Sequence, residues 1–186
     1  MKKILLFLTG SVAACRGTAI VRALQKQNFE VMCVLTEAAQ RFVGVDALAA
    51  ISRNPVFSNS LFSEAPSNGI LAKSHFPHLE WAQSMDAFLV APATADSLFR
   101  LAHGSAEGVA EVVALATRAP ILVAPAMNPA MLHSAVVQEN LSILQSRGVE
   151  ILPTKMGIAA CGDEGPGKLL DPEIIAQYVL RALSPQ

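Results

Sequence analysis

Short apolar runs alternate along the chain with longer segments in which apolar residues recur at helical spacing. Runs rich in Ile, Leu, Val and Phe predict buried strands, and the amphipathic segments between them predict helices. The predicted strands are Lys3–Thr9, Phe29–Leu35, Ala87–Ala91, Ile121–Ala124 and Glu150–Leu152. The predicted helices are Ala14–Gln27, Val45–Ile51, Ala95–Ala102, Ala110–Thr117, Ser134–Arg147 and Pro172–Leu183. This order indicates an α/β fold in which a single doubly wound parallel sheet has helices on both faces.

Several residues mark the ends of these elements. Asn28 and Gly148 stand where a left-handed residue is expected to end a helix, and Asp171 precedes Pro172 as the N-cap of the last helix. Two stretches, Phe57–His75 and Pro153–Leu170, show neither an apolar run nor helical spacing of apolar residues, and they are expected to be loops. The second, which holds several glycines, is predicted to be a mobile loop over about 153–170 that closes over a substrate.

The composition indicates one globular domain spanning residues 1–186. Apolar residues make up 52% and charged residues 16%, which excludes a disordered chain, and the net charge of −1 gives no case for nucleic acid or an anionic membrane. The three cysteines form no disulfide framework, the apolar run Ile4–Leu8 is too short for a signal peptide, and no run approaches about 18 apolar residues. We therefore expect a cytoplasmic protein that spans no membrane.

Small and polar residues follow the first two predicted strands. Gly10 permits a tight turn, and Ser11 offers a hydroxyl at the start of a helix, so together they are suited to holding a phosphate; alternatively, Ser11 is only an N-cap. Thr36 follows the second strand and is compatible with a further contact to a phosphate or a ribityl chain. The segment is neither a dinucleotide fingerprint nor a Walker loop, which disfavours a nicotinamide site or an NTPase.

Two later strand ends share one pattern, a proline followed by small residues and then one amide or acid. Residues 91–97 read Ala-Pro-Ala-Thr-Ala-Asp-Ser, and residues 124–131 read Ala-Pro-Ala-Met-Asn-Pro-Ala-Met. Small side chains let a flat ligand approach the backbone, and in a parallel sheet ligands bind beyond the carboxyl ends of the strands. Ordinary turns with N-caps would explain one such segment, but they explain the whole set less well.

With these motifs the chain resembles the homo-oligomeric flavin-containing cysteine decarboxylase family across about 160 residues. Four landmarks carry the resemblance, in this order: Gly10-Ser11-Val12-Ala13-Ala14; His78, fourteen residues before Pro92; Pro125-Ala126-Met127-Asn128-Pro129-Ala130-Met131; and Ala160-Cys161-Gly162-Asp163-Glu164-Gly165-Pro166-Gly167. The motifs that hold Asn128 and Cys161 are the specific ones.

The resemblance implies a Rossmann-like flavoprotein with FMN as its cofactor and no metal. It implies FMN contacts by nine residues: Gly10, Ser11, Val12, Thr36, Thr94, Ala95, Asp96, Ser97 and Ala126. It implies that His78 and Cys161 are catalytic and that Asn128, Ala160 and Lys168 contact substrate. It also implies a homotrimer or a dodecamer of trimers.

The implied activity is decarboxylation of 4′-phosphopantothenoyl-L-cysteine to 4′-phosphopantetheine in coenzyme A biosynthesis. Oxidising the side-chain carbon to a thioaldehyde gives an electron sink β to the carboxylate, and hydride return after loss of carbon dioxide makes the reaction redox-neutral. His78 would serve as acid and base, and Cys161 would donate a proton in the second half. Arg16, Lys155 and Lys168 are candidates for the substrate phosphate.

Two of the candidate site residues also have a purely structural interpretation, and the sequence departs from the family at several positions. His78 is alternatively a surface residue at the start of a helix over Pro77–Gln83, and Asn128 a plain N-cap. Cys15 stands where many relatives have tyrosine, and Gly108 where they often have an acid.

Other functions within this fold remain alternatives. They are a peptidyl-cysteine decarboxylase of the lantibiotic type, a flavin prenyltransferase, and a non-catalytic regulatory subunit. A separate phosphopantothenoylcysteine synthetase is a candidate partner, because the fused synthetase domain of many relatives has no counterpart in this sequence.

Overall fold

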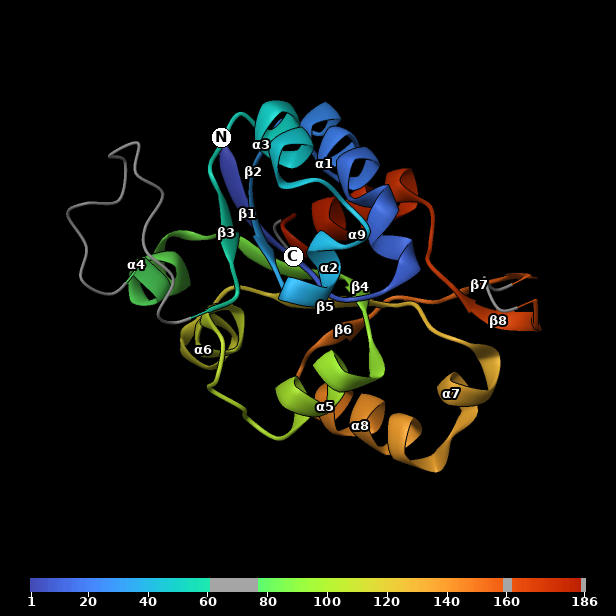
Figure 1. Ribbon diagram of the computed structural model, residues 1–186. Coiled ribbons are helices and arrows are strands. Elements are labelled where there is room, and N and C mark those ends of the chain that lie inside the picture. The colour runs from blue at the N-terminus through green and yellow to red at the C-terminus, as the bar shows by residue number, and fades with distance from the viewer. Residues whose placement is uncertain (61–76, 159–161, 185–186) are drawn as a thin grey trace.

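In the computed structural model, which describes residues 1–60, 77–158 and 162–184, six parallel strands form one sheet (Figure 1). From one edge to the other, the strands are β3 (Val56–Ser58), β2 (Phe29–Leu35), β1 (Lys2–Leu8), β4 (Ala87–Ala93), β5 (Ile121–Pro125) and β6 (Glu150–Ile151). The strand order reverses between β1 and β4, and a crevice for ligands forms at such a switch point, beyond the carboxyl ends of the strands. The predicted doubly wound parallel sheet is therefore confirmed.

Helices cover both faces of this sheet. On one face lie α1 (Gly17–Lys26), α3 (Val45–Ser52) and α9 (Pro172–Ala182), and on the other lie α4 (Pro77–Ser84), α5 (Ala95–Ala102), α6 (Val109–Ala116) and α8 (Ala135–Ser146) (Figure 1). Short helices follow three strands directly: the 3-10 helix η1 (Val12–Arg16), α2 (Glu37–Gln40) and α7 (Pro129–His133). The chain thus meets a helix N-terminus soon after each of the four central strands, which is where the site forms.

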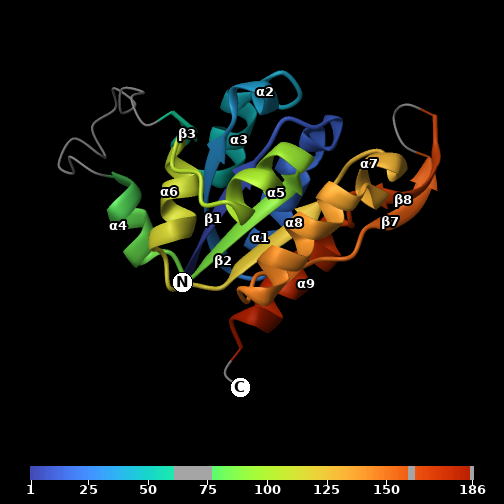
Figure 2. The same cartoon turned by 90° about the horizontal axis from the view of Figure 1, so that it is seen from below.

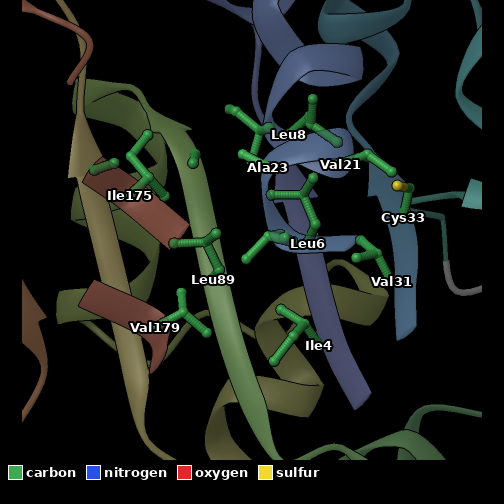
Figure 3. Packing of buried hydrophobic residues seen from close by; sticks show 14 of the residues in the cluster. Ile4, Leu6, Leu8, Val21, Ala23, Val31, Cys33, Leu89, Ile175 and Val179 are labelled. Carbon is green, nitrogen blue, oxygen red and sulfur yellow. The ribbon is translucent and has the colours of Figure 1, made fainter. Parts of the chain in front are cut away.

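Strand β1 is the centre of the hydrophobic core, and its side chains divide between the two faces. Ile4, Leu6 and Leu8 pack toward α1 and α9, as Figure 3 shows, whereas Leu5 and Phe7 pack on the opposite side. All five are at most 1% exposed. A strand buried on both faces needs apolar residues at every position, which is why the sequence shows a run there rather than an alternation. Burial of each of these side chains contributes about 1.5–3 kcal/mol.

The structure corrects several expected boundaries. The predicted helix Ala14–Gln27 begins instead as η1 and becomes α-helical only at Gly17. The predicted loop Phe57–His75 begins within the edge strand β3; its residues 61–75 lie outside the described part. Asn28 and Gly148 do have the expected left-handed conformation, with φ of 62° and 83°.

The stretch 153–170, expected to be an irregular loop, instead contains an antiparallel hairpin. Its strands are β7 (Lys155–Ile158) and β8 (Glu164–Lys168), and the hairpin lies beside α7 at one end of the molecule (Figure 2). The backbone of Gly167 pairs with the loop after β5, since Met127 N donates to Gly167 O at 2.9 Å. A Cβ at Gly167 would lie 2.3 Å from Met127 O, so this close approach requires glycine.

Candidate active site

A cavity of about 730 Å³ lies at the carboxyl ends of β1, β2, β4 and β5, and we call it the first cavity. Eight of the nine residues expected to contact a flavin line it, and the ninth, Val12, lines a neighbouring cavity. The eight come from four separate segments of the chain. Beyond their position after the strands, the sequence did not show that these segments meet around one space.

Three hydroxyl side chains in this cavity also cap helices. Ser11 Oγ accepts a hydrogen bond from Ala13 N at 3.3 Å, and Thr36 Oγ1 accepts one from Ala39 N at 3.1 Å. Thr94 Oγ1 accepts one from Ser97 N at 3.2 Å. A hydroxyl that accepts at a cap still carries its own O–H donor, so capping by Ser11 and Thr36 is compatible with donation to a ligand oxygen. The hydroxyl of Thr94 already donates to Ser97 Oγ at 3.3 Å. Ser11 is thus confirmed as an N-cap, and this role is compatible with a contact between its hydroxyl and a phosphate.

Thr9 and Gly10 shape the turn between β1 and the cavity. Thr9 is buried; its Oγ1 donates to Pro92 O at 2.7 Å and accepts from Thr94 N at 3.2 Å, which ties β1 to β4 at the switch point. A Cβ on Gly10 would lie 2.4 Å from the Cβ of Ala38, so only glycine fits between the turn and α2. Thr9 was not among the predicted site residues, although a polar residue ending an apolar strand was a signal for it.

Charge is distributed unevenly in the first cavity. Its one cation among the described residues that line it is Arg100, whereas four carboxylates line it: Glu37, Asp96, Glu107 and Glu111. Arg100 pairs with Glu107 at 2.5 Å and with Asp96 at 2.8 Å, and hydrogen bonds to these two side chains raise its pKa further above its ordinary value. Arg100 is therefore committed to carboxylates of its own chain.

Two further residues of the first cavity, Asn59 and Glu111, were not predicted from the sequence. Asn59 Nδ2 donates to Glu111 Oε2 at 2.8 Å, and Asn59 Oδ1 accepts from Ala110 N at 2.8 Å. Glu111 is only 3% exposed. A buried carboxylate is stable only with such partners, so this pair is a structural unit at the wall of the cavity.

A second cavity, of about 370 Å³, adjoins the first, and Ser11, Ala126 and Met127 line both. Asn128 lies in the second cavity, where its Oδ1 caps α7 by accepting from Ala130 N at 2.7 Å and its Nδ2 donates to the carboxylate of Asp163. The N-cap interpretation of Asn128 is therefore confirmed, and its amide nitrogen is the part that faces a carboxylate. Lys168 also lines this cavity.

His78, one of the two predicted catalytic residues, is not brought to these cavities. His78 is in the first turn of α4, which packs against α6 at one edge of the molecule (Figure 2), and it is not among the residues that line either cavity. Cys161 and Ala160 lie outside the described residues.

The other two cysteines differ from each other in environment. Cys33 is buried in β2, where desolvation raises the pKa of its thiol to about 12, so it is chemically inert. Cys15 is exposed in η1 and lines the second cavity. The described residues include no group of three or more His, Cys, Asp or Glu side chains suited to a metal, and among them no helix is long and apolar enough to cross a membrane.

The chain is similar in sequence to known proteins. A sequence model of the family described as Flavoprotein matches residues 1–184. The chain is 36% identical over 180 residues to a probable phosphopantothenoylcysteine decarboxylase of Streptococcus mutans. The aligned region covers 96% of this chain and 97% of that protein. It is 42% identical over 174 residues to the coenzyme A biosynthesis bifunctional protein CoaBC of Haemophilus influenzae, covering 94% of this chain. The chain spans 42% of the length of that bifunctional relative.

Two solved structures extend the comparison. One is a PPC decarboxylase variant complexed with pantothenoylaminoethenethiol, with a TM-score of 0.83, 25% identity and coverage of 97% of each chain. The other is the FMN-dependent cysteine decarboxylase SpaF, with a TM-score of 0.79, 25% identity and coverage of 99% of this chain and 98% of that one.

Proposed function

The chain belongs to the Flavoprotein family, and from this premise we propose that it is an FMN-dependent decarboxylase of 4′-phosphopantothenoyl-L-cysteine that forms 4′-phosphopantetheine in coenzyme A biosynthesis. The observation that carries the proposal is the pair of joined cavities at the carboxyl edge of the sheet. The first has the size of a nucleotide site, and the second holds Asn128. The name of the relative from Streptococcus mutans supports this reaction, and the name of the relative from Haemophilus influenzae supports a role in coenzyme A biosynthesis.

The residues of the first cavity fit FMN. Its volume of about 730 Å³ lies in the usual range for small-molecule sites, and Gly10 keeps the turn after β1 free of a side chain. We assign the hydroxyls of Ser11, Thr36 and Thr94 to the phosphate and ribityl oxygens. The remaining proposed contacts are Gly10, Val12, Ala95, Asp96, Ser97 and Ala126. Bound FMN supplies a reversible hydride acceptor, which a redox-neutral decarboxylation requires.

Asn128 is the proposed anchor of the substrate carboxylate. Its Oδ1 is engaged at the N-terminus of α7, so the side-chain amide of Asn128, which lines the second cavity, is held in one orientation. That nitrogen donates to the carboxylate of Asp163, and a substrate carboxylate is an acceptor of the same chemistry. We propose that holding this group beside Met127, which lines both cavities, turns the cysteine Cβ–H bonds toward the first cavity. Ala160 and Lys168 remain proposed substrate contacts.

Proton handling is assigned to His78 and Cys161, by resemblance. An imidazole nitrogen can act as a general base and is suited to take the thiol proton, and a thiol is suited to protonate the carbon in the last step. Because His78 lies outside both cavities of its own chain, we propose that it acts in the site of a neighbouring subunit. A homotrimer or a dodecamer of trimers would supply that neighbour.

The proposed compartment is the cytoplasm, and the proposed partner in sequence is a phosphopantothenoylcysteine synthetase. Cys15 and Cys33 are free thiols, as expected in a reducing compartment. The bifunctional name of the relative from Haemophilus influenzae supports a connection with a second coenzyme A biosynthesis activity.

The proposed function is tested by measuring the release of carbon dioxide and the mass of the product. Incubation of the purified, yellow protein with 4′-phosphopantothenoylcysteine is expected to release carbon dioxide and give a product lighter by that molecule alone. A product lighter by two further hydrogens indicates oxidative decarboxylation, and turnover of a peptide with a C-terminal cysteine instead indicates the peptidyl enzyme. Absence of turnover on both substrates contradicts the proposed function.

A further inference from the structure

The two joined cavities have opposite charge. Among the residues that line the first cavity, carboxylates outnumber the single cation, Arg100. The second cavity is lined by two cations, Arg16 and Lys168, and by no acidic residue of the described chain. The charge of the second cavity therefore favours an anionic group bound within it.

Arg16 is held at this cavity by Asp171. The distance from Arg16 Nη2 to Asp171 Oδ1 is 3.3 Å, and Lys155 Nζ lies 2.5 Å from Asp171 Oδ2. Asp171 occupies the N-cap position of α9, yet its side chain makes no capping hydrogen bond. Its carboxylate serves the two cations instead, and the hydrogen bonds from Lys155 and then Arg16 lower its pKa, which keeps it charged.

The charges that remain favour a phosphate monoester. Asp171 neutralises one of the two cations that it contacts, so the group of Arg16, Lys155 and Asp171 keeps one positive charge, and Lys168 adds a second. The carboxylate of Asp163, bonded to Asn128 Nδ2, offsets one of them, so the net charge around the second cavity stays positive. A phosphate monoester carries about −1.5 to −2 at pH 7. Arg16 has five N–H donors, and the bond to Asp171 engages only one nitrogen of the guanidinium.

The rest of the second cavity suits the carbon chain of the same ligand. Val12 and Ile158 are exposed apolar side chains that line it. The stem of Lys168 lies across Gly157, where a Cβ would approach Lys168 Cδ to 3.3 Å, so Gly157 leaves room for this lysine on the hairpin.

We propose that Arg16 and Lys168 bind the phosphate of the substrate, with Asp171 as the positioning residue that holds Arg16. This inference rests on the proposed function and names the part of the site that selects a phosphorylated substrate. Arg16 and Lys168 line the cavity and contact the phosphate, whereas Lys155 balances the charge of Asp171.

The test compares kcat/KM for 4′-phosphopantothenoylcysteine with that for pantothenoylcysteine, which lacks the phosphate. The wild-type preference for the phosphorylated substrate is expected to fall about 10–100-fold in Arg16→Gln and in Lys168→Gln, through KM, as expected for loss of a charged hydrogen bond. Asp171→Asn is expected to lower the preference less, about 3–10-fold. Inorganic phosphate should inhibit the wild type competitively and the Arg16→Gln variant more weakly.

Matched controls are Arg22→Gln and Lys26→Gln, which change exposed cations on α1 away from both cavities and should retain the preference. Flavin absorbance and circular dichroism identify a variant that fails to fold, in which case the phosphate inhibition constants of the conservative Arg16→Lys and Lys168→Arg variants decide. An unchanged preference in both variants, or an equal loss on both substrates, overturns the phosphate assignment. A wild type that decarboxylates neither substrate contradicts the proposed function instead.

Discussion

Asn59 and Glu111, which lie 52 residues apart in the chain, are joined by a hydrogen bond of 2.8 Å from Asn59 Nδ2 to Glu111 Oε2. Gly108, the N-cap residue of α6, has no side chain to cap that helix, and Asn59 Oδ1 instead accepts from Ala110 N. Asn59, the residue after β3, thus caps a helix that starts 50 positions later, and Glu111 orients the amide that does so.

Asn59→Ala is expected to lower the free energy of unfolding by about 1–3 kcal/mol, because it removes the cap and leaves the buried Glu111 carboxylate without this donor. Urea unfolding at fixed protein and FMN concentration measures it, with the fluorescence of the buried Trp81, the only tryptophan, as the probe. Glu107→Ala is the control; that carboxylate is 78% exposed, and its removal should cost less than about 1 kcal/mol. An equal loss in both variants would show that the Asn59–Glu111 pair has no special role.

Gly108→Asp is expected to destabilise the wild-type protein and to stabilise a variant that lacks the Asn59 and Glu111 side chains. In the wild type, a Cβ at Gly108 would lie 2.2 Å from both Asn59 Nδ2 and Glu111 Oε2, so the substitution breaks their hydrogen bond and destabilises the protein. In the Asn59→Ala/Glu111→Ala double variant the space is open, and an aspartate at the N-cap caps α6 directly, which should stabilise it by about 0.5–2 kcal/mol. The same urea titration measures both; destabilisation in both backgrounds would contradict this account.

The central strands of the sheet could be predicted from the sequence, whereas the contact between Asn59 and Glu111 could not. The run Ile4–Leu8 is recognisable because a strand buried on both faces needs apolar side chains throughout. The span Phe29–Leu35 is apolar at every position except the half-buried Glu30. β3 has only three residues, all half-buried, so no run marks it. The Asn59–Glu111 contact depends on how β3 and α6 meet across the sheet, and nothing local to either residue indicates it.

The candidate site divides in the same way. Positions after the strands, such as Ser11 and Thr94, could be predicted because the carboxyl ends of parallel strands share one edge. The hairpin β7–β8 could not, because the sequence Glu-Gly-Pro-Gly-Lys of β8 shows no alternation. Its backbone is held by pairing with β7 and by the hydrogen bond from Met127 N to Gly167 O, which are tertiary contacts.

Gly10→Ala is expected to weaken FMN binding about tenfold or more, because its Cβ would lie 2.4 Å from the Cβ of Ala38 and push the turn after β1 into the first cavity. Ala38→Gly in the same chain removes the opposing atom and should restore most of the affinity. Fluorescence titration of the apoprotein with FMN measures both, and acid should release the flavin in free form. If Ala38→Gly rescues nothing, the close approach is not the cause.

Asp171 is expected to contribute to stability at neutral pH and to lose that contribution in acid. Hydrogen bonds from Lys155 and Arg16 lower its pKa below the ordinary value of 3.8, so the native state binds its proton less tightly than the unfolded state does. The stabilisation is therefore present above about pH 4 and is lost as the pH falls through the lower native pKa. Asp171→Asn and the double variant Arg16→Gln/Lys155→Gln should both flatten the profile of unfolding free energy between pH 2 and 5, by about the same amount. A steep wild-type profile that both leave unchanged assigns the acid sensitivity to other carboxylates.

His78→Asn and Cys161→Ser are expected to stop the proposed reaction at different stages. An asparagine cannot take the thiol proton, so His78→Asn should leave substrate intact and the bound flavin yellow. A serine hydroxyl is a far weaker acid than a thiol, so Cys161→Ser should release carbon dioxide but accumulate the unsaturated thiol, with loss of the yellow colour under anaerobic conditions. Anaerobic rapid mixing followed by mass spectrometry distinguishes these outcomes, because the accumulated compound is two hydrogens lighter than 4′-phosphopantetheine.

Mixing His78→Asn with a second variant, Asn128→Asp, tests which subunit's site His78 serves, because His78 lies outside both cavities of its own chain. If His78 acts in a neighbour's site, hetero-oligomers of His78→Asn and Asn128→Asp subunits should regain part of the wild-type activity, since some sites then combine an intact His78 with an intact Asn128. Co-expression with two different affinity tags yields the mixed species, and the separate homo-oligomers are the controls. Mixed species with no more activity than the controls would place His78 in the site of its own chain. Formation of 4′-phosphopantetheine by Cys161→Ser at the wild-type rate would remove Cys161 as the proton donor.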